Sequence, residues 1–407
     1  MAAPILSIVF KNESGLADTD VFVGFVGGTL NAANAATGEA IDLSQHGSPH
    51  WYTLGDLSAG VALSQYVGGR VYFCYGKPWT FERPGYEPSS SNFNDPNYYC
   101  RYDKMELTYI PTEWDVADTT AIDYFSIPLA LNVYHGGLKG TKVGAVTGAT
   151  TATTIAALGG VSSPAGAAIV NDKAGKFVRV IGPGAYPPSP GLPASPFDNF
   201  EAYLEFLRDV YAPAHGNAVA RIKGVFGGVG DDPKTPETKR QNYDFTATID
   251  ANLDITLTGS ADLVGPRTLR LAKADMIAPA GIYGANPVFS IDGAAKINPQ
   301  NDVFGWLIGD LLSGLNIGSV GSTVTLGGHP VPVGAMNSQD WFKLTKFFGD
   351  LQPGHARNYN QWAAAMAPIS QAYNFAYSDR FAHVVATLNA VKPPFVDTLE
   401  IVVLPDK

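Results

Sequence analysis

Short runs of apolar, β-branched and aromatic residues, separated by Gly, Pro, Asn and Asp, dominate the pattern of this chain. Such runs, with apolar and polar positions in alternation, are typical of β-strands joined by turns. Strands are predicted at residues 5–10, 20–26, 69–76, 177–181, 245–249, 254–258, 268–272 and 397–404. The pattern therefore predicts a mainly β protein.

Helical spacing occurs in fewer places. The clearest case is residues 197–211, which carry an apolar stripe and a candidate N-cap, Asp198. The stripe consists of Phe200, Tyr203, Leu204, Leu207 and Val210. Further helices are predicted at residues 153–158, 303–315 and 359–370.

The order of these elements predicts the domain organisation. Strand patterns fill both ends of the chain, whereas strands and helices mix in the middle. We therefore expect a β domain over residues 1–135, completed by about 365–407, and a mixed α/β domain over 136–364. The 44 Gly, 29 Pro and the charged share of 16% in 407 residues agree with many strands and turns.

Charge limits the classes of partner. The net charge of −10 argues against nucleic acid or an anionic membrane surface, so we expect neither as a partner. No stretch reaches the roughly 18 consecutive apolar residues of a membrane-spanning helix. A neutral ligand is more compatible with this composition.

Signatures of metal or redox chemistry are few. Cys74 and Cys100 are the only cysteines, and either one disulfide or two buried thiols is compatible with the sequence. They cannot form a disulfide framework or a four-cysteine zinc site. The sequence also has no Gly-x-Ser-x-Gly elbow, no Walker A loop and no His-Glu-x-x-His helix. We expect no metal and no organic cofactor.

Two acidic residues stand in a predicted hairpin formed by residues 102–109 and 120–128. Glu106 and Asp123 are equidistant from the midpoint of the connecting segment, so a simple register places them opposite each other, with Cβ atoms roughly 5 Å apart. Facing carboxylates repel, and this cost requires an explanation. General acid/base chemistry on a glycosidic bond is one, because it needs two carboxylates at a common cleft.

Neighbouring side chains fit the same interpretation. Thr108 follows Glu106 by two residues and shares its strand face, and Thr120 could line the end of the cleft. Trp114 at the predicted turn, together with Tyr102 and Tyr124, could offer flat surface to sugar rings. The alternative is that the aromatic residues are strand core and that the acids are solvated edge residues.

Several motifs resemble a known group of proteins. AIDYFSIPL at residues 121–129 resembles the V-D-x-F-x-(I/L)-P stretch shared by thaumatin-like proteins and family 64 glycoside hydrolases, and MELT at 105–108 stands where they carry E-F-T. AYNFAYSD at 372–379 is similar to A-Y-x-F-x-Y-D-D, with Ser378 in place of an Asp. Thaumatin-like proteins have many disulfides, so the cysteine-poor β-1,3-glucanase branch, family 64, matches better.

This resemblance implies a fold and a reaction. The fold would be crescent-shaped, with a thaumatin-like β-barrel or sandwich domain and a mixed α/β domain on either side of a wide groove for β-1,3-glucan. Glu106 would be the proton donor and Asp123 the base that activates water, with inversion at the anomeric carbon. Inverting enzymes separate their carboxyl groups by about 6.5–9.5 Å, so the side chains must splay apart or the register be offset. Burial of Glu106 against aromatic residues would help to keep it protonated.

The sequence thus predicts a monomeric, endo-acting, inverting hydrolase of β-1,3-glucan. We expect it to be extracellular, although residues 1–10 show no signal-peptide pattern. One alternative is a non-catalytic β-1,3-glucan-binding or antifungal protein of the thaumatin-like group. Another is a structural or interaction protein in which the two acids are incidental.

Overall fold

The computed structural model describes residues 5–144, 150–186, 191–229, 234–284, 286–380, 384–391 and 393–406. The chain forms two compact units. The first comprises Met1–Gly182, Ala365–Asn374 and Phe381–Lys407, and the second comprises Pro183–Ala364 and Phe375–Arg380. None of the described helices is long and apolar enough to cross a membrane.

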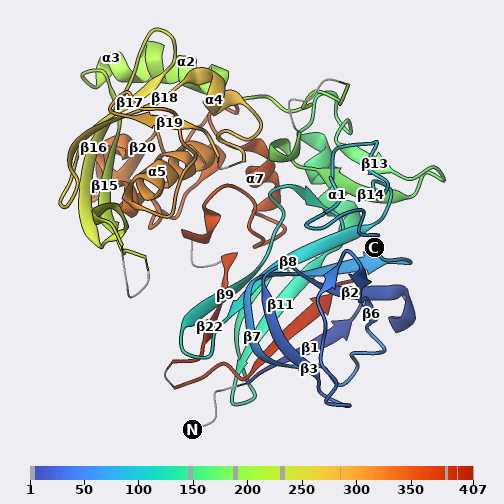
Figure 1. The fold of residues 1–407 in the computed structure, drawn as a ribbon. Coiled ribbons are helices and arrows are strands. Elements are labelled where there is room, and N and C mark those ends of the chain that lie inside the picture. The colour runs from blue at the N-terminus through green and yellow to red at the C-terminus, as the bar shows by residue number, and fades with distance from the viewer. Residues whose placement is uncertain are drawn as a thin grey trace. The chain divides into compact units, whose positions relative to one another are not determined.

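A large sheet forms the centre of the first unit (Figure 1). Its main path runs β12-β11-β23-β1-β7-β8-β9-β22, and β2, β3 and β6 attach beside it. The sheet curls into a half-barrel, and the predicted mainly β fold is confirmed. The strands are β1 (Leu6–Asn12), β2 (Val21–Val26), β3 (Thr29–Asn34), β6 (Tyr52–Thr53), β7 (Val61–Tyr75), β8 (Tyr102–Tyr109), β9 (Trp114–Thr119), β11 (Leu129–His135), β12 (Leu138–Gly144), β22 (Ala386–Asn389) and β23 (Thr398–Val403).

The two ends of the chain meet in this sheet. β1 pairs in parallel with β23, so the last strand, red in Figure 1, lies beside the first, in blue. A parallel pair cannot be closed by a tight turn and needs a long connection. Here the connection is most of the chain, including the whole second unit.

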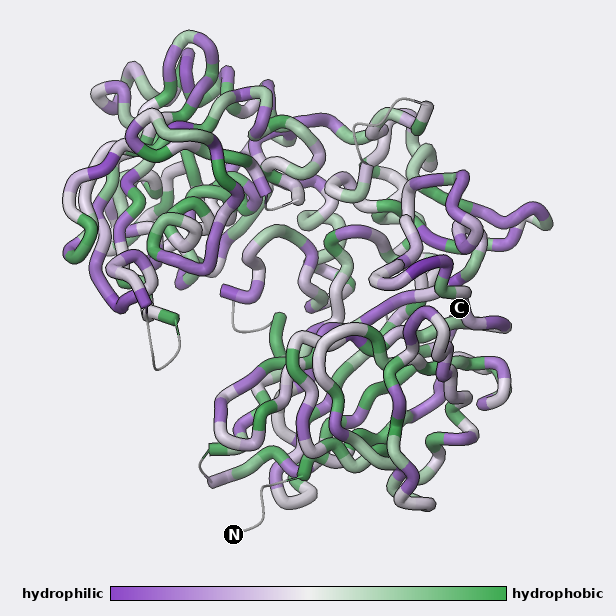
Figure 2. The backbone as a smooth tube through the Cα atoms, viewed as in Figure 1, coloured by the Kyte–Doolittle hydropathy of each residue, from purple (hydrophilic) through white to green (hydrophobic). Residues whose placement is uncertain are grey.

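Alternation along β8 separates a core face from a polar face. Met105, Leu107 and Tyr109 are buried in the main core of the first unit. Successive side chains of a strand point to opposite faces. Glu106 and Thr108 therefore face away from this core. Figure 2 shows hydrophobic and hydrophilic residues mixed along the strands of this unit.

Residues 136–182, which the sequence analysis placed with the second region, pack within the first unit. β12 pairs with β11, and a small sheet has the order β10-β14-β13. The additional elements are β4 (Ser44–Gln45), β5 (Ser48–Pro49), β10 (Tyr124–Phe125), α1 (Thr151–Gly160), β13 (Ile169–Asn171) and β14 (Phe177–Ile181). β10 lies within residues 120–128, the second strand of the predicted acidic hairpin, and directly follows Asp123, so its pairing with β14 helps to place that segment.

The second unit is built on an antiparallel sheet with the order β15-β16-β17-β18-β19 (Figure 1). Alternate residues of this sheet and nearly all of α5 form its core. Its elements are α2 (Glu201–Phe206), α3 (Ala212–Ala214), β15 (Ala218–Phe226), β16 (Gln241–Ile249), β17 (Ile255–Ala261), β18 (Gly265–Leu271), α4 (Lys273–Ile277), β19 (Phe289–Ile291), α5 (Val303–Ile317), β20 (Thr323–Leu326), β21 (His329–Pro332) and α6 (Ser338–Trp341). The chain passes back to the first unit within α7 (Gln361–Met366).

The amphipathic helix predicted at 197–211 differs from the structure in two details. Its regular part begins at Glu201 without a side-chain cap, so the predicted N-cap is wrong; Asp198 instead accepts hydrogen bonds from Arg357. A π-helical turn, Leu207–Tyr211, shifts the register by its wider spacing. Val210 is consequently 60% exposed, unlike the other members of the stripe.

Candidate active site

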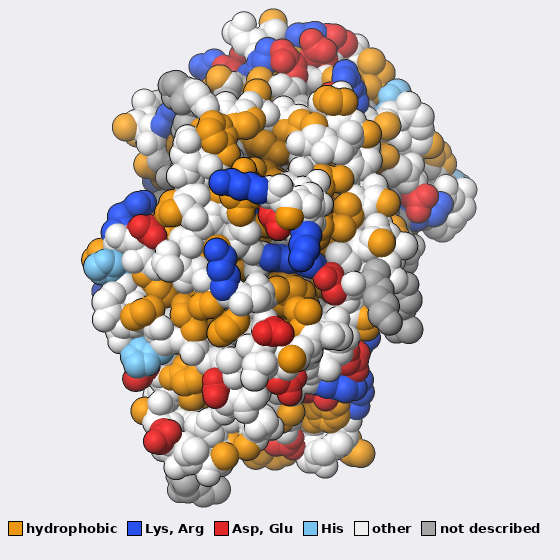
Figure 3. Space-filling view, turned by 90° about the vertical axis from the view of Figure 1, so that its right-hand side faces the viewer, with side chains coloured by type: hydrophobic (Ala, Val, Ile, Leu, Met, Phe, Trp, Pro, Cys, Tyr) orange, Lys and Arg blue, Asp and Glu red, His pale blue; other side chains and the backbone are white. Residues whose placement is uncertain are grey.

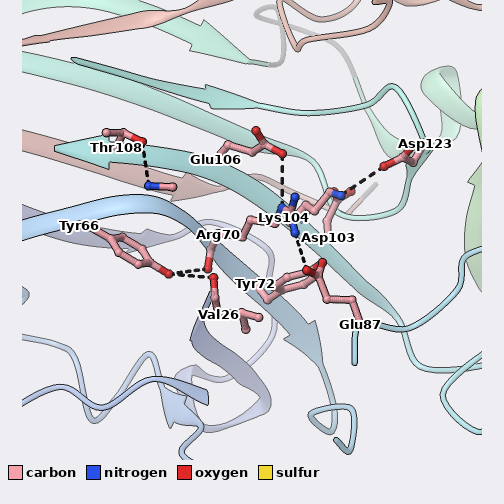
Figure 4. A network of polar contacts seen from close by, with 11 residues as sticks. Val26, Tyr66, Arg70, Tyr72, Glu87, Asp103, Lys104, Glu106, Thr108 and Asp123 are labelled. Atoms are coloured by element: carbon pink, nitrogen blue, oxygen red, sulfur yellow. Dashed lines mark hydrogen bonds and ion pairs between the residues drawn. The ribbon is translucent and has the colours of Figure 1, made fainter. Parts of the chain in front are cut away.

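The polar face of β7, β8 and β9 brings charged side chains into register (Figure 4). Arg70 lies opposite Glu106, and Glu106 lies opposite Asp118 on the next strand. Two residues further along each strand, Tyr72 lies opposite Lys104. Directly opposed residues have Cβ atoms about 5 Å apart, so these side chains are neighbours on one side of the sheet, where Glu106 is exposed and Tyr72 and Asp118 are buried.

The predicted register of the acidic hairpin is wrong, because Glu106 faces Asp118 and not Asp123. The turn is shorter than expected. Glu113 N donates to Ile110 O at 3.0 Å, and Ile110 N donates to the carboxylate of Asp115 at 2.5 Å. β9 therefore already begins at Trp114, and Asp123 lies beyond its end.

Glu106 is exposed on this face. Its side chain is 49% exposed, and its carboxylate lies 3.4 Å from Arg70 Nε. The expected burial against aromatic rings is therefore wrong. Arg70 also contacts Glu87, which in turn accepts a hydrogen bond from the Tyr72 hydroxyl. Glu106 thus shares its cation with a second carboxylate.

Asp123 is fixed at both its main chain and its side chain. Its carbonyl accepts a hydrogen bond from Gly182 N at 2.7 Å, and its carboxylate lies 3.2 Å from Lys104 Nζ. The approach of Gly182 is so close that a Cβ there would meet the Ile122 carbonyl oxygen at 2.5 Å. Only glycine fits at this position. The close approach of Gly182 therefore fixes the main chain at Ile122 and Asp123, just before β10.

Lys104 of β8 is the common neighbour of Glu106 and Asp123. Lys104 and Glu106 are two residues apart on β8, which corresponds to about 6.5 Å along a strand. Asp123 contacts the outer end of Lys104 (Figure 4). The two carboxylates are therefore not cross-strand partners. Each is close to a different cation, Glu106 to Arg70 and Asp123 to Lys104.

The predicted sugar-binding tyrosines are core residues. Tyr102 is 1% exposed and Tyr124 is 5% exposed, and their rings pack edge to face with centroids 5.4 Å apart. Neither presents a ring face to solvent, so their assignment to sugar stacking is wrong. The alternation of β8 did not reveal this, because a second core cluster covers Tyr102 on that side.

The remaining predicted binding residues have different surroundings. Trp114 is 52% exposed at the start of β9, rather than at the turn tip. Thr108 is half-buried, and its hydroxyl accepts a hydrogen bond from Gly68 N at 3.1 Å. Thr120 is buried and bridges to Tyr373 through the backbone. Trp114 is therefore the most accessible of the three.

Sequence reasoning missed four residues of this face. Arg70 and Asp118 lie opposite Glu106 on the two adjacent strands, Lys104 pairs with Asp123, and Glu87 binds Arg70. Lys104 could have been found, because it precedes Glu106 by two residues and must share its face. Asp118 could have been found only if the length of the turn, and with it the register of β8 and β9, had been predicted correctly.

Other candidate chemistry is sparse in the described part of the chain. No group of three or more His, Cys, Asp or Glu is placed to hold a metal ion among those residues. Cys74 and Cys100 are buried free thiols, and burial raises the pKa of the Cys100 thiol. On the face shown in Figure 3, acidic and basic side chains are interspersed with apolar ones.

Glycosidic bonds are cleaved by two carboxyl groups, and the first unit has two candidates for such groups, Glu106 on β8 and Asp123 beside Lys104 of the same strand. The comparison with known families agrees. The family profile described as "Beta-1,3-glucanase" matches residues 6–213, just over half of the chain. The chain belongs to glycoside hydrolase family 64, and it is a β-1,3-glucan hydrolase.

Solved structures share the fold over the full length. A laminaripentaose-producing β-1,3-glucanase in complex with laminaritetraose matches with a TM-score of 0.60 and 15% identity, covering 100% of both chains. A β-1,3-glucanase domain of family 64 from Clostridium beijerinckii matches with a TM-score of 0.60 and 15% identity, covering 99% of both chains. No curated protein matches the sequence significantly.

Proposed function

We propose that the protein is an endo-acting, inverting β-1,3-glucanase in which Glu106 is the general acid and Asp123 the general base. The observation that carries this proposal is the arrangement of the two carboxylates. Glu106 projects from β8, and Asp123, beyond the end of β9, contacts the side chain of Lys104 two residues earlier on β8, so the two carboxylates are not directly opposed. Inverting hydrolysis needs such a separation, because water and sugar must fit between the carboxyl groups.

The chemistry assigns one proton transfer to each residue. Glu106, exposed beside Arg70, donates its proton to the glycosidic oxygen as the bond to the anomeric carbon breaks. Asp123 takes a proton from the water that attacks the opposite face of that carbon. The new hydroxyl is therefore α, and the leaving chain ends in a free 3-hydroxyl.

The substrate is a neutral polymer of β-1,3-linked glucose. The laminaripentaose-producing relative was solved with laminaritetraose, an oligosaccharide of this kind, and we propose that this chain binds the same class of ligand. Trp114 supplies an exposed ring beside the polar face, and Thr108 and Thr120 supply hydroxyls near it. The crescent shape and the wide groove between two domains remain predictions, as do a monomeric state and an extracellular location, which suits an insoluble substrate.

The test is chromatography of products from a linear β-1,3-glucan with wild type, Glu106→Gln and Asp123→Ala. Wild type should release short oligosaccharides, and both variants should lose about 10³-fold in kcat. Retained binding to insoluble glucan shows that the variants are folded. Glucan binding by wild type without turnover would favour the non-catalytic alternative. Undiminished activity of the variants would show that other carboxylates act.

Azide distinguishes the two roles. In Asp123→Ala a small anion can take the place of the activated water and attack the anomeric carbon while Glu106 protonates the leaving oxygen. The expected product is the α-glycosyl azide, identified by NMR. Glu106→Gln should give no such product from an oligosaccharide. Formation of the β-azide would contradict inversion. If azide restored activity to Glu106→Gln and not to Asp123→Ala, Glu106 would be the base and Asp123 the acid.

A further inference from the structure

Asp123 lies outside the hairpin ladder, so cross-strand pairing does not hold its carboxylate. Its carbonyl is bound by Gly182, which fixes the main chain but leaves the side-chain torsions free. The ion pair of the carboxylate with Lys104 Nζ, at 3.2 Å, is the contact that fixes the side chain. A base that must hold a water at the anomeric carbon needs such a contact, because misplacement by about 1 Å can cost about 10²-fold in rate.

Lys104 is itself held in place. Its side chain is only 12% exposed, although it stands on the outer face of β8. Its ammonium lies 5.9 Å from the centroid of the Tyr124 ring, within the range of a cation–π contact. Asp103, buried at the preceding position of the strand, accepts a hydrogen bond from the main-chain N of Lys104 at 2.8 Å. The long flexible stem of a lysine is thus restricted to one direction.

A buried arginine supports the same ring. Arg179 on β14 is 0% exposed, and its Cζ lies 5.8 Å from the Tyr124 ring and 4.4 Å from the Tyr102 ring. It donates hydrogen bonds to the carbonyls of Ser90 and Cys100, and among the described residues no carboxylate accepts one from it. A buried cation without a paired anion is costly. The position of this cation requires an explanation beyond stability.

We propose that Lys104 is a positioning residue for Asp123. Its ammonium, resting against the Tyr124 ring that Arg179 supports from the interior, fixes the orientation of the carboxylate. The proposal rests on the assignment of Asp123 as the base. Lys104 touches neither water nor sugar in this account, so its effect falls on kcat and passes through Asp123.

The first test compares Lys104→Met with Lys104→Arg on a soluble β-1,3-gluco-oligosaccharide. Met keeps the length of the apolar stem but removes the charge, so kcat should fall about 10- to 100-fold while KM changes less than about threefold. Arg keeps the charge and should recover most of the loss. Lys296→Met is the matched control, because Lys296 pairs with Asp275 in the second unit; its kcat should be that of wild type.

A double-mutant cycle shows whether the effect passes through Asp123. In the Asp123→Ala background with azide, no carboxylate remains to be oriented, so Lys104→Met should change the azide-supported rate by less than about twofold. Tyr124→Leu should lower kcat in wild type and cause no further loss in Lys104→Met. A purely structural role would give the same loss in every background.

Each outcome is decisive. Unchanged kcat in Lys104→Met overturns the proposal, and so does a loss of the same size in both backgrounds. A raised KM with unchanged kcat would mean that Lys104 binds substrate instead. If Asp123→Ala forms no α-azide, the base assignment fails, and the role of Lys104 fails with it. If the α-azide forms and Lys104→Met is fully active, only the present proposal is wrong.

Discussion

Each unit has a large sheet with charged side chains on one face, and the two faces use charge differently. The sheet of the first unit includes the parallel pair β1–β23, whereas that of the second unit is antiparallel throughout. In the second unit Asp244 is bound by Arg221 at 2.7 Å and by Lys223 at 3.0 Å. In the first unit Arg70 serves both Glu87 and Glu106. Cations therefore surround a carboxylate in the second unit, whereas carboxylates share a cation in the first.

The residues next to these charges extend the contrast. In the second unit a row of hydroxyl residues, Thr246, Thr258 and Thr268, crosses the sheet beside the ion pairs. In the first unit the residue opposite Glu106 is another acid, Asp118. Facing like charges lower stability. The first face thus departs from the arrangement that stability alone favours, as functional sites do.

The largest difference is expected when one carboxylate is neutralised on each face, Glu106 in the first unit and Asp244 in the second. The first change should lower activity and the second should lower stability. Glu106→Gln should lose about 10³-fold in kcat, because it cannot act as an acid, and its free energy of unfolding should be unchanged or higher, because a repulsion with Asp118 is relieved. Asp244→Asn should keep its kcat and lose about 0.5 kcal/mol of stability with the exposed ion pairs. Steady-state kinetics and urea denaturation of the two variants measure both quantities.

The buried arginines extend the comparison to the interior. In the second unit Arg380 pairs with Asp310, which has no exposed surface and also accepts hydrogen bonds from Tyr243 and Ser338 at 2.6 Å each. Arg380→Met leaves the buried Asp310 carboxylate without its cation. The free energy of unfolding should fall by about 3–5 kcal/mol, measured by urea denaturation.

Arg179→Met leaves no buried carboxylate without a cation, because Arg179 donates to backbone carbonyls. It should lower the free energy of unfolding by about 2 kcal/mol or less. Its kcat should nevertheless fall, because the Tyr124 ring loses its support. Equal stability losses in Arg179→Met and Arg380→Met would contradict the contrast between the two interiors.

The pH dependence of stability should have opposite signs in the two units. Burial raises the pKa of Asp103 to about 7 from its ordinary value of 3.8. Its contribution to stability is therefore fully present below pH 3.8 and is lost as the pH rises through about 7. The hydrogen bond from Arg221 lowers the pKa of Asp244, so that contribution is present above pH 3.8 and is lost as the pH falls below it.

Thermal unfolding of two variants checks these signs. Asp103→Asn should lower Tm more at pH 4 than at pH 8, whereas Asp244→Asn should lower it more at pH 7 than at pH 3. The same direction of change in both variants would contradict the assignment.

The smallest effect is expected at the exposed aromatic residue of the polar face. Trp114→Ala should raise KM about fivefold, because one aromatic contact contributes about 1 kcal/mol, and should leave kcat unchanged. Leu263→Ala removes a comparably exposed large apolar side chain, 50% exposed against 52%, in the second unit and should not change KM. If both variants behave alike, Trp114 has no specific part in binding.

The alternation and length of apolar runs revealed most of the fold. β14 covers the predicted residues 177–181, and α5 begins at Val303 as predicted. Both are bounded by local signals, a turn before the strand and the Asp302 N-cap before the helix. Local signals of this kind act within a few residues and can be read from sequence.

The site was only partly predictable. The common face of Glu106 and Thr108 follows from the period of a strand. The register did not follow, because the turn is fixed by a side-chain hydrogen bond from Ile110 N to Asp115, which alternation does not encode. The burial of Tyr124 depends on Arg179, more than fifty residues away in the chain, and no local pattern reports such a contact.

The most direct test of the account is the anomeric configuration of the first product, followed by ¹H NMR during hydrolysis of a soluble β-1,3-gluco-oligosaccharide. Two displaced carboxylates that activate water and protonate the leaving oxygen predict that the α-anomer accumulates first and then mutarotates to β. Initial accumulation of the β-anomer would contradict the assignment of Glu106 and Asp123 as an inverting pair.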